Sequence, residues 1–263
     1  MRTAVKPARM PEERSGEISA DAGGAGWEVV RYRVGAQGYT NVERYDANRY
    51  KGSTNEYRQA VMANAYKRLI GPLNGKRVLD VGCGTGRGIA EFVHEAAFAA
   101  GTDASVDMLG VAARKTAGNL RGAFAGAYAQ NLPFRDASFD VVTSLNFLHL
   151  FSLDSQRTMI GEMKRVLKPG GFGVLEFDNA LHGLVVGPYK RISGRERGSL
   201  PAEIRYVIGD GCRVARFYGA VCPVFWRVFR RFPAFFSRIE KVEYFPPFNR
   251  LAHRIYCKII KNR

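Results

Sequence analysis

Three alternate glycines follow an aspartate in the stretch DVGCGTGRG, residues 80–88, directly after the apolar run RVL. Glycine allows positive φ and lets a backbone approach a ligand closely, as the turn of a nucleotide-type cofactor site requires. The spacing is G-x-G-x-G, at Gly82, Gly84 and Gly86. A dinucleotide fingerprint would place its third glycine at Arg87, and a phosphate-binding P-loop would need a Gly-Lys-Ser/Thr run that is absent.

The acid in front of these glycines narrows the type of ligand. Asp80 would repel a pyrophosphate, whereas it favours a ligand that carries an ammonium and a sulfonium. Asp103 follows Gly82 by 21 residues and could accept hydrogen bonds from both ribose hydroxyls. A similar spacing occurs in dinucleotide sites, so Asp103 alone does not separate the two types of cofactor.

Alternating strands and helices must position these residues. The pattern predicts parallel βαβ units in a doubly wound α/β sheet, and two further strands near the end of the chain close it. An amphipathic helix over 54–70 precedes the sheet, with Tyr57, Val61, Ala65 and Leu69 on one stripe. The expected strands lie at 77–82, before Asp103, at 122–130, from Phe139, at 172–178, in 212–220 and in 253–261.

Four segments in this order resemble the class I S-adenosylmethionine-dependent methyltransferases, and the likeness is to their small-molecule, type 11-like branch. They are the glycine turn, the strand ending at Asp103, AQNLPFRDASFDVV (129–142) and EMKRVLKPGG (162–171). The resemblance covers residues 76–178. It implies a Rossmann-like fold with a seven-stranded, mostly parallel sheet, S-adenosylmethionine as the cofactor, and methyl transfer as the activity.

The resemblance also implies which residues contact the cofactor. Tyr128 stands where the family usually has an acid that accepts from the adenine amine, and either the Gln130 side-chain carbonyl or a backbone group is expected to serve instead. The segment ERYDANRY resembles a helix of the small-molecule branch that closes over the cofactor, with Arg49 meeting its carboxylate. The implied cofactor-binding residues are Asp80, Gly82, Cys83, Gly84, Gly86, Asp103, Ala104, Met108, Ala129, Gln130, Asn131, Leu145, Tyr45 and Arg49.

Catalysis of methyl transfer places few demands on the protein beyond alignment of the acceptor, because the sulfonium methyl is already activated. A hydroxyl acceptor also benefits from a general base. His149 follows the fourth strand and is the candidate base, with packing against the cofactor as the alternative. Glu176 and Asp178 end the fifth strand and could orient a polar acceptor or act as ordinary capping or solvated acids.

The chain is expected to divide into a disordered tail (1–26), a helical cap (27–75) and a methyltransferase domain (76–263). Within that domain, residues 221–250 interleave Phe and Trp with Arg, which favours an interfacial amphipathic helical insert; a lid packed on the sheet is the alternative. Such a cover suits an acceptor with an apolar tail and an anionic head, such as a lipid-linked sugar, or stacked nucleic-acid bases.

The formal net charge is +16, and residues 187–263 contain 17 Lys and Arg against 5 Asp and Glu. Such a surface attracts the phosphates of nucleic acid or of anionic lipid. SLNF stands where a DNA or RNA base methylase would carry Asp/Asn-Pro-Pro-Tyr/Phe or Pro-Cys, which makes nucleic acid the less favoured acceptor. We therefore expect transfer to a hydroxyl oxygen of a small-molecule or lipid-linked acceptor. An RNA methyltransferase and a catalytically silent cofactor-binding protein that docks on a membrane or partner are the alternatives.

The four cysteines are scattered without a C-x-x-C pair, so neither a metal site nor a disulfide framework is expected. No apolar run has the length of a membrane span, and the first residues lack the apolar segment of a signal peptide. These features predict a cytoplasmic protein with peripheral contact at the inner face of the membrane through 221–250.

Overall fold

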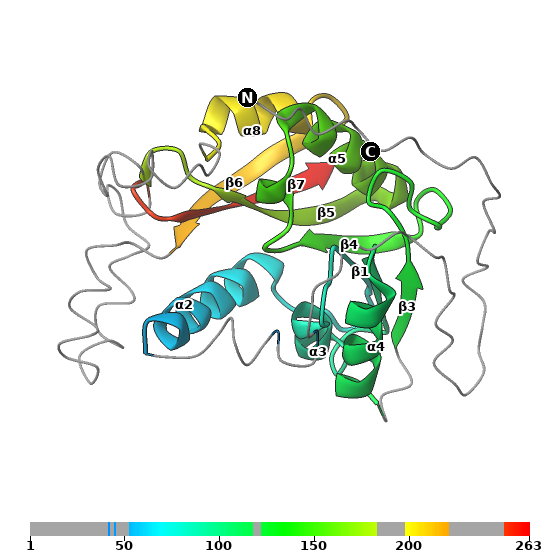
Figure 1. Ribbon diagram of the computed structural model, residues 1–263. Helices are drawn as coiled ribbons and strands as arrows, with labels where there is room; N and C mark the ends of the chain where they lie inside the picture. Colours follow the sequence, from blue (N-terminus) through cyan, green and yellow to red (C-terminus); the bar gives the residue numbers. More distant parts are fainter. Residues whose placement is uncertain (1–41, 43–44, 46–52, 118–121, 183–197, 221–249) are drawn as a thin grey trace, which may run out of the picture.

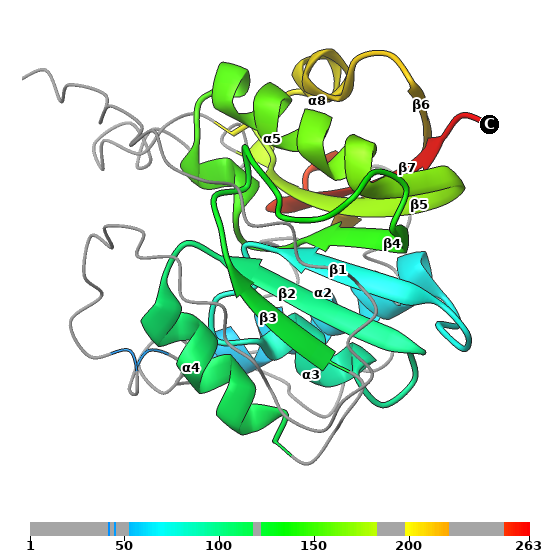
Figure 2. The same ribbon diagram turned by 90° about the vertical axis from the view of Figure 1, so that its right-hand side faces the viewer.

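The computed structural model describes residues 42, 45, 53–117, 122–182, 198–220 and 250–263. Within these residues a single sheet lies between two layers of helices, so the molecule has three layers (Figures 1 and 2). This is the doubly wound α/β arrangement that the alternation of strands and helices predicts. The helix expected over 54–70 is confirmed as α2 (Ser53–Ile70).

Seven strands of the described chain form the sheet, in the order β3-β2-β1-β4-β5-β7-β6. The strands β1 to β5 pair in parallel, whereas β7 lies antiparallel between β5 and β6. The order reverses between β1 and β4, which is where open α/β sheets bind ligands at the carboxyl ends of their strands. The bounds are β1 Arg77–Val81, β2 Phe98–Asp103, β3 Gly122–Gly126, β4 Phe139–Ser144, β5 Leu167–Asp178, β6 Cys212–Ala220 and β7 Arg254–Lys261.

Each face of the sheet has its own apolar core, because alternate residues of the strands point to opposite faces. On one face, α2 buries Val61, Ala65 and Leu69 beside the apolar sides of α3 (Arg87–Phe92) and α4 (Val106–Lys115). On the other face, α5 (Leu153–Val166) and α8 (Pro201–Ile208) pack together. Apolar burial on both faces stabilises β1, whose last four residues are all buried.

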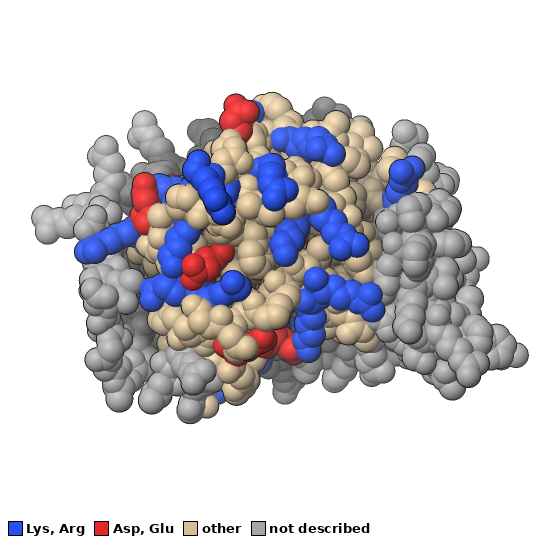
Figure 3. Space-filling model, turned by 180° about the vertical axis from the view of Figure 1, so that it is seen from behind, with Lys and Arg blue, Asp and Glu red and all other residues tan. Residues whose placement is uncertain are grey.

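Basic side chains gather at the edge of the sheet where the parallel strands begin, on the face that Figure 3 shows. Arg77 begins β1, Lys168 lies near the start of β5, and Lys261 ends the antiparallel β7. Lys168 pairs with Asp140 at 2.8 Å, and Lys261 donates to the carbonyl oxygens of Lys164 and Leu167, each at 2.7 Å. Part of this charge therefore compensates the negative end of α5. This edge lies opposite the carboxyl ends of β1 and β2.

Candidate functional site

The glycine turn leaves β1 and leads directly into α3. Gly82, Gly84 and Gly86 have φ of +71°, +53° and +75°, a region that other residues rarely adopt. A Cβ on Gly82 would lie 2.3 Å from the Phe147 ring, and one on Gly86 would lie 2.6 Å from the Cβ of Ala112. A Cβ on Gly84 would meet no atom within 4 Å, so the turn is open on that side. Conformation and close packing together explain the three glycines.

The Asp80 side chain lies beneath this turn rather than at its surface, and only 3% of the residue is exposed. The Thr143 hydroxyl donates to its Oδ1 at 2.8 Å. Burial raises the pKa of the Asp80 carboxyl to about 7, the nearby charge of Asp103 adds to the rise, and the Thr143 hydrogen bond opposes it. A Cβ on Gly88 would lie 2.5 Å from Asp80 Oδ2, which explains a glycine that the G-x-G-x-G pattern does not.

Asp103 ends β2 and holds the open side of the turn. Its Oδ2 accepts from the Gly84 N–H and its Oδ1 accepts from the Ser105 N–H, both at 2.9 Å. Burial raises the pKa of Asp103, although these backbone hydrogen bonds oppose the rise. The structure thus gives Asp103 a positioning role, because it joins the glycine turn to the start of α4, where Ser105 is the N-cap.

A clamp centred on Arg165 holds the loop that follows β3. The Arg165 guanidinium donates to the carbonyl oxygens of Leu132 and Phe134, at 2.9 and 2.7 Å, and to Glu162 and Asp136. Glu162 in turn accepts from the Leu132 N–H at 2.8 Å, and its hydrogen bonds with Arg165 lower its pKa. The two segments that resemble the family, 129–142 and 162–171, are therefore joined by direct contacts.

Of the other residues predicted to contact the cofactor, most are described by the structure and one, Arg49, is not. Cys83, Met108 and Ala129 are buried, Ala104, Gln130 and Leu145 are partly buried, Asn131 is exposed, and Tyr45 is helical and partly buried. Tyr128, at the position of the usual acid, is 44% exposed. Arg49 and the tail at 1–26 lie outside the described residues, as do 27–41 of the expected cap and 221–249 of the expected insert. The roles assigned to all these residues stay predictions.

On the acceptor side, Arg254 contacts His149, which follows β4, and Glu176 and Asp178, which lie at the end of β5. Its Nη1 lies 3.2 Å from His149 Nδ1 and donates to Asp178 Oδ1, and its Nε lies 3.3 Å from Glu176 Oε1. Arg254 is 5% exposed and Glu176 is fully buried. Burial raises the pKa of Glu176, and the charge of Arg254 opposes the rise. Glu176 is therefore a structural partner of Arg254, whereas Asp178 keeps 27% of its side chain exposed.

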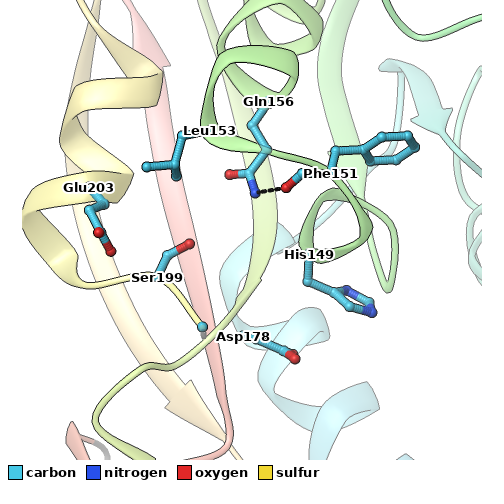
Figure 4. A pocket seen from close by; sticks show the side chains of 8 residues that line it. His149, Phe151, Leu153, Gln156, Asp178, Ser199 and Glu203 are labelled. Carbon is cyan, nitrogen blue, oxygen red and sulfur yellow. Dashed lines mark hydrogen bonds between the residues drawn. The ribbon is translucent and has the colours of Figure 1, made fainter. Parts of the chain in front are cut away.

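A pocket of about 260 Å³ opens beside this cluster, at the carboxyl end of β5 (Figure 4). Its described walls come from the 3-10 helix η2 (Leu148–Leu150), the start of α5, the end of β5 and the segment that leads into α8. The described lining residues are His149, Phe151, Leu153, Gln156, Asp178, Gly198, Ser199 and Glu203. His149 and Asp178 thus share one pocket, and their contact with an acceptor stays a prediction.

Sequence reasoning missed Arg254 and Gln156. Arg254 begins β7 and is paired across the antiparallel ladder with Asp178, so a register assignment between 172–178 and 253–261 would have found it. Gln156 lies in the helix after the fourth strand, where no pattern distinguishes it from a solvent-facing residue.

Two absences hold for the described part of the chain. No group of three or more His, Cys, Asp and Glu there is arranged to hold a metal ion. The helices among those residues also lack the combined length and apolar character that crossing a membrane requires.

Comparison with known proteins shows what this chain is similar to. Residues 78–171 match a methyltransferase domain. The chain is 41% identical over 107 residues to a demethylmenaquinone methyltransferase of Clavibacter sepedonicus, over 41% of this chain and 43% of the relative. It is 32% identical over 152 residues to a phthiotriol/phenolphthiotriol dimycocerosates methyltransferase of Mycobacterium tuberculosis, over 55% and 54%. The chain thus spans about half the length of these curated relatives.

Solved structures share the fold. Magnesium protoporphyrin IX methyltransferase from Synechocystis PCC 6803, with bound SAH, superimposes with a TM-score of 0.59 at 20% identity, over 85% of this chain and 95% of that one. The glycine turn, the strand order with its antiparallel β7 and the matched residues agree: residues 78–171 match a methyltransferase domain, and the chain is similar to the class I S-adenosylmethionine-dependent methyltransferases.

Proposed function

We propose that this protein transfers a methyl group from S-adenosylmethionine to a hydroxyl oxygen of a small-molecule or lipid-linked acceptor. One observation carries the proposal: the glycine turn and the pocket with His149 and Asp178 lie at the same edge of the sheet. The turn follows β1, and the pocket lies beyond β4 and β5. Cofactor and acceptor bound at these places would meet at the strand-order reversal.

The residues around the turn fit the cofactor. The backbone is open at Gly84, and the Asp103 carboxylate beside it accepts hydrogen bonds, as ribose hydroxyls would require. The buried Asp80 provides negative charge beneath the turn when it is ionised. When bound, S-adenosylmethionine supplies a methyl group activated by its sulfonium. The chain's own task is then to align the acceptor and exclude water.

From the contact with Arg254 we infer a role for His149 other than the expected general base, which itself stays a prediction. A guanidinium N–H can only donate, so the Nδ1 that faces it must accept, and the ring proton of neutral His149 lies on Nε2. In this tautomer His149 offers a donor to the acceptor oxygen. The Asp178 carboxylate in the same pocket is then the group that takes the hydroxyl proton as the new bond forms.

The relatives support the acceptor class. Their names state methylation of demethylmenaquinone and of phthiotriol dimycocerosates, which are quinone and lipid substrates of those proteins. Peripheral membrane contact through 221–250 remains part of the proposal and rests on the sequence of that segment, because 221–249 lies outside the described residues.

A methyl-transfer assay tests the proposal. Purified protein is incubated with methyl-labelled S-adenosylmethionine and separate lipid, sugar and RNA extracts, and label is expected in the lipid or sugar fraction. Label confined to RNA would refute the acceptor class, and no label in any fraction would favour a catalytically silent protein. The His149→Gln variant, whose amide retains a donor and an acceptor, should keep more activity than His149→Ala.

The basic edge of the sheet favours RNA as a second candidate acceptor (Figure 3). It lies away from the pocket, so RNA would have to extend around the molecule to be methylated. Steep salt dependence of RNA binding together with turnover would support this candidate. Absence of RNA binding at low salt would remove it.

A further inference from the structure

The pocket beside His149 is rich in hydrogen-bond acceptors. Gln156, Asp178 and Glu203 each present an oxygen that can only accept, and Ser199 presents a hydroxyl. The described lining residues include no side chain that can only donate, because Lys, Arg and Trp are absent from among them. A ligand that satisfies this wall must therefore bring hydrogen-bond donors.

Gln156 gives the sharpest evidence for a bound donor. The residue is 4% exposed, and its Nε2 donates to the Phe151 carbonyl at 2.9 Å, which fixes the orientation of the amide. Its Oε1 is buried and has no hydrogen-bond partner among the described residues. Figure 4 shows this oxygen directed into the space between Leu153 and Ser199. A buried acceptor without a partner is costly, so a donor from a ligand would relieve that cost.

The charges on the described lining residues of the pocket disfavour an anionic head group. Asp178 and Glu203 bring two carboxylates, and the nearby cation, Arg254, is already engaged by Asp178 and Glu176. Glu203 also accepts from the Leu200 N–H at 2.7 Å, which holds its carboxylate at the start of α8. A phosphate or carboxylate here would face like charges from these two described side chains. The composition of 221–250 favoured an anionic head instead, and that expectation stays a prediction. Phe151 and Leu153 add an apolar wall that suits a hydrocarbon chain.

We propose that this pocket binds an uncharged head that carries at least two hydroxyl groups, attached to an apolar chain. One hydroxyl donates to Gln156 Oε1 and another to the Asp178 carboxylate. The inference rests on the proposed function in one respect: it takes the occupant of the pocket to be the methyl acceptor. Binding itself is measurable without the methyl donor.

The test uses the full chain and three probes with the same decyl chain length, below their micelle concentrations. They are 1-decanoylglycerol, which has two free hydroxyls, methyl decanoate, which has none, and decyl phosphate, which is anionic. Calorimetry should show that 1-decanoylglycerol binds at least about tenfold more tightly than either of the others, because only it pairs with the buried acceptors.

Variants then connect this preference to the pocket. Gln156→Leu should weaken binding of 1-decanoylglycerol by about five- to thirtyfold, the usual effect of one buried hydrogen bond. Ser199→Ala removes a hydroxyl from the same wall and should also weaken binding of 1-decanoylglycerol. This variant replaces Gln156→Leu in the test if Gln156→Leu does not fold. Glu203→Gln keeps an acceptor for the Leu200 N–H and removes one negative charge. Decyl phosphate should therefore bind to this variant about threefold to tenfold more tightly than it binds to the wild type. Thr158→Ala, on the exposed side of α5, is the matched control and should change none of these affinities.

The outcomes separate this inference from the proposed function. The inference is overturned if decyl phosphate binds as tightly as 1-decanoylglycerol, or if both Gln156→Leu and Ser199→Ala bind 1-decanoylglycerol like the wild type. If 1-decanoylglycerol binds as expected, but neither this probe nor any extract fraction is methylated, the inferred ligand of the pocket is supported and the proposed methyl transfer is refuted.

Discussion

Replacement of Asp80 by Asn should change how the stability of the protein depends on pH. The Asp80 carboxyl is buried and its pKa is raised to about 7, whereas an exposed aspartate titrates near 3.8. Between these values the unfolded chain has lost the proton and the folded chain retains it, so the free energy of unfolding falls as pH rises. Above about pH 7 both states are ionised and the loss is complete.

The expected size of this effect follows from the two pKa values. At about 1.4 kcal/mol per pH unit, the Asp80 contribution falls by about 2.5 kcal/mol between pH 5 and pH 8. Asn keeps the shape and can still accept from the Thr143 hydroxyl, but it does not ionise. The free energy of unfolding of the variant minus that of the wild type should therefore be larger, in favour of the folded variant, at pH 8 than at pH 5 by about that amount.

Urea unfolding of both proteins, followed by circular dichroism at several pH values, measures this difference. The contributions of the other titrating groups cancel, because both proteins contain them. Asp107→Asn is the control, because Asp107 is an exposed acid in the first turn of α4. If the wild type and Asp80→Asn lose stability in parallel from pH 5 to pH 8, Asp80 does not retain its proton in the folded state, and the reasoning from its burial is wrong.

Three further variants test other parts of the site. Gly82→Ala should destabilise the fold more than Gly84→Ala in urea unfolding, because both incur the positive-φ cost of about 1–2 kcal/mol but only the former places a Cβ against Phe147. Asp103→Ala should weaken S-adenosylmethionine binding at least about tenfold by calorimetry, since the turn loses its tie to β2. Arg254→Met should cost about 3–5 kcal/mol of unfolding free energy, because it leaves the buried Glu176 carboxyl without its cation.

The outcomes that would contradict these expectations are specific. Equal destabilisation by the two glycine variants would show that Phe147 moves aside. Unchanged cofactor affinity in Asp103→Ala would separate that carboxylate from the cofactor site. A fully stable Arg254→Met would mean that Glu176 is protonated and Asp178 is solvated, and combining Arg254→Met with Glu176→Gln should then add nothing.

The fold and the glycine turn could be predicted because their signals are local. Buried strands of the parallel sheet appear as apolar runs, and the G-x-G-x-G spacing lies within a few residues of β1. The depth of Asp80 was not predictable, because it depends on α3 and on the absence of a side chain at Gly88. The pairing of Asp178 with Arg254 spans 76 residues of sequence and depends on the antiparallel register of β5 and β7. The contact between Arg254 and His149 depends on that same register, so sequence reasoning could propose the histidine but not this contact.

The position of β7 has a consequence for the order in which the molecule assembles. β7 is the last strand along the sequence, yet it fills an interior place, and its neighbours β5 and β6 both pair with it. During synthesis β6 therefore leaves the ribosome before the strand against which it pairs. The sheet can close, and Arg254 can take its place beside Asp178, only when residues 254–261 insert between the two. A nascent chain arrested before residue 254 should accordingly expose one edge of β5 and leave β6 unpaired, which makes it a target for chaperones that bind extended apolar segments.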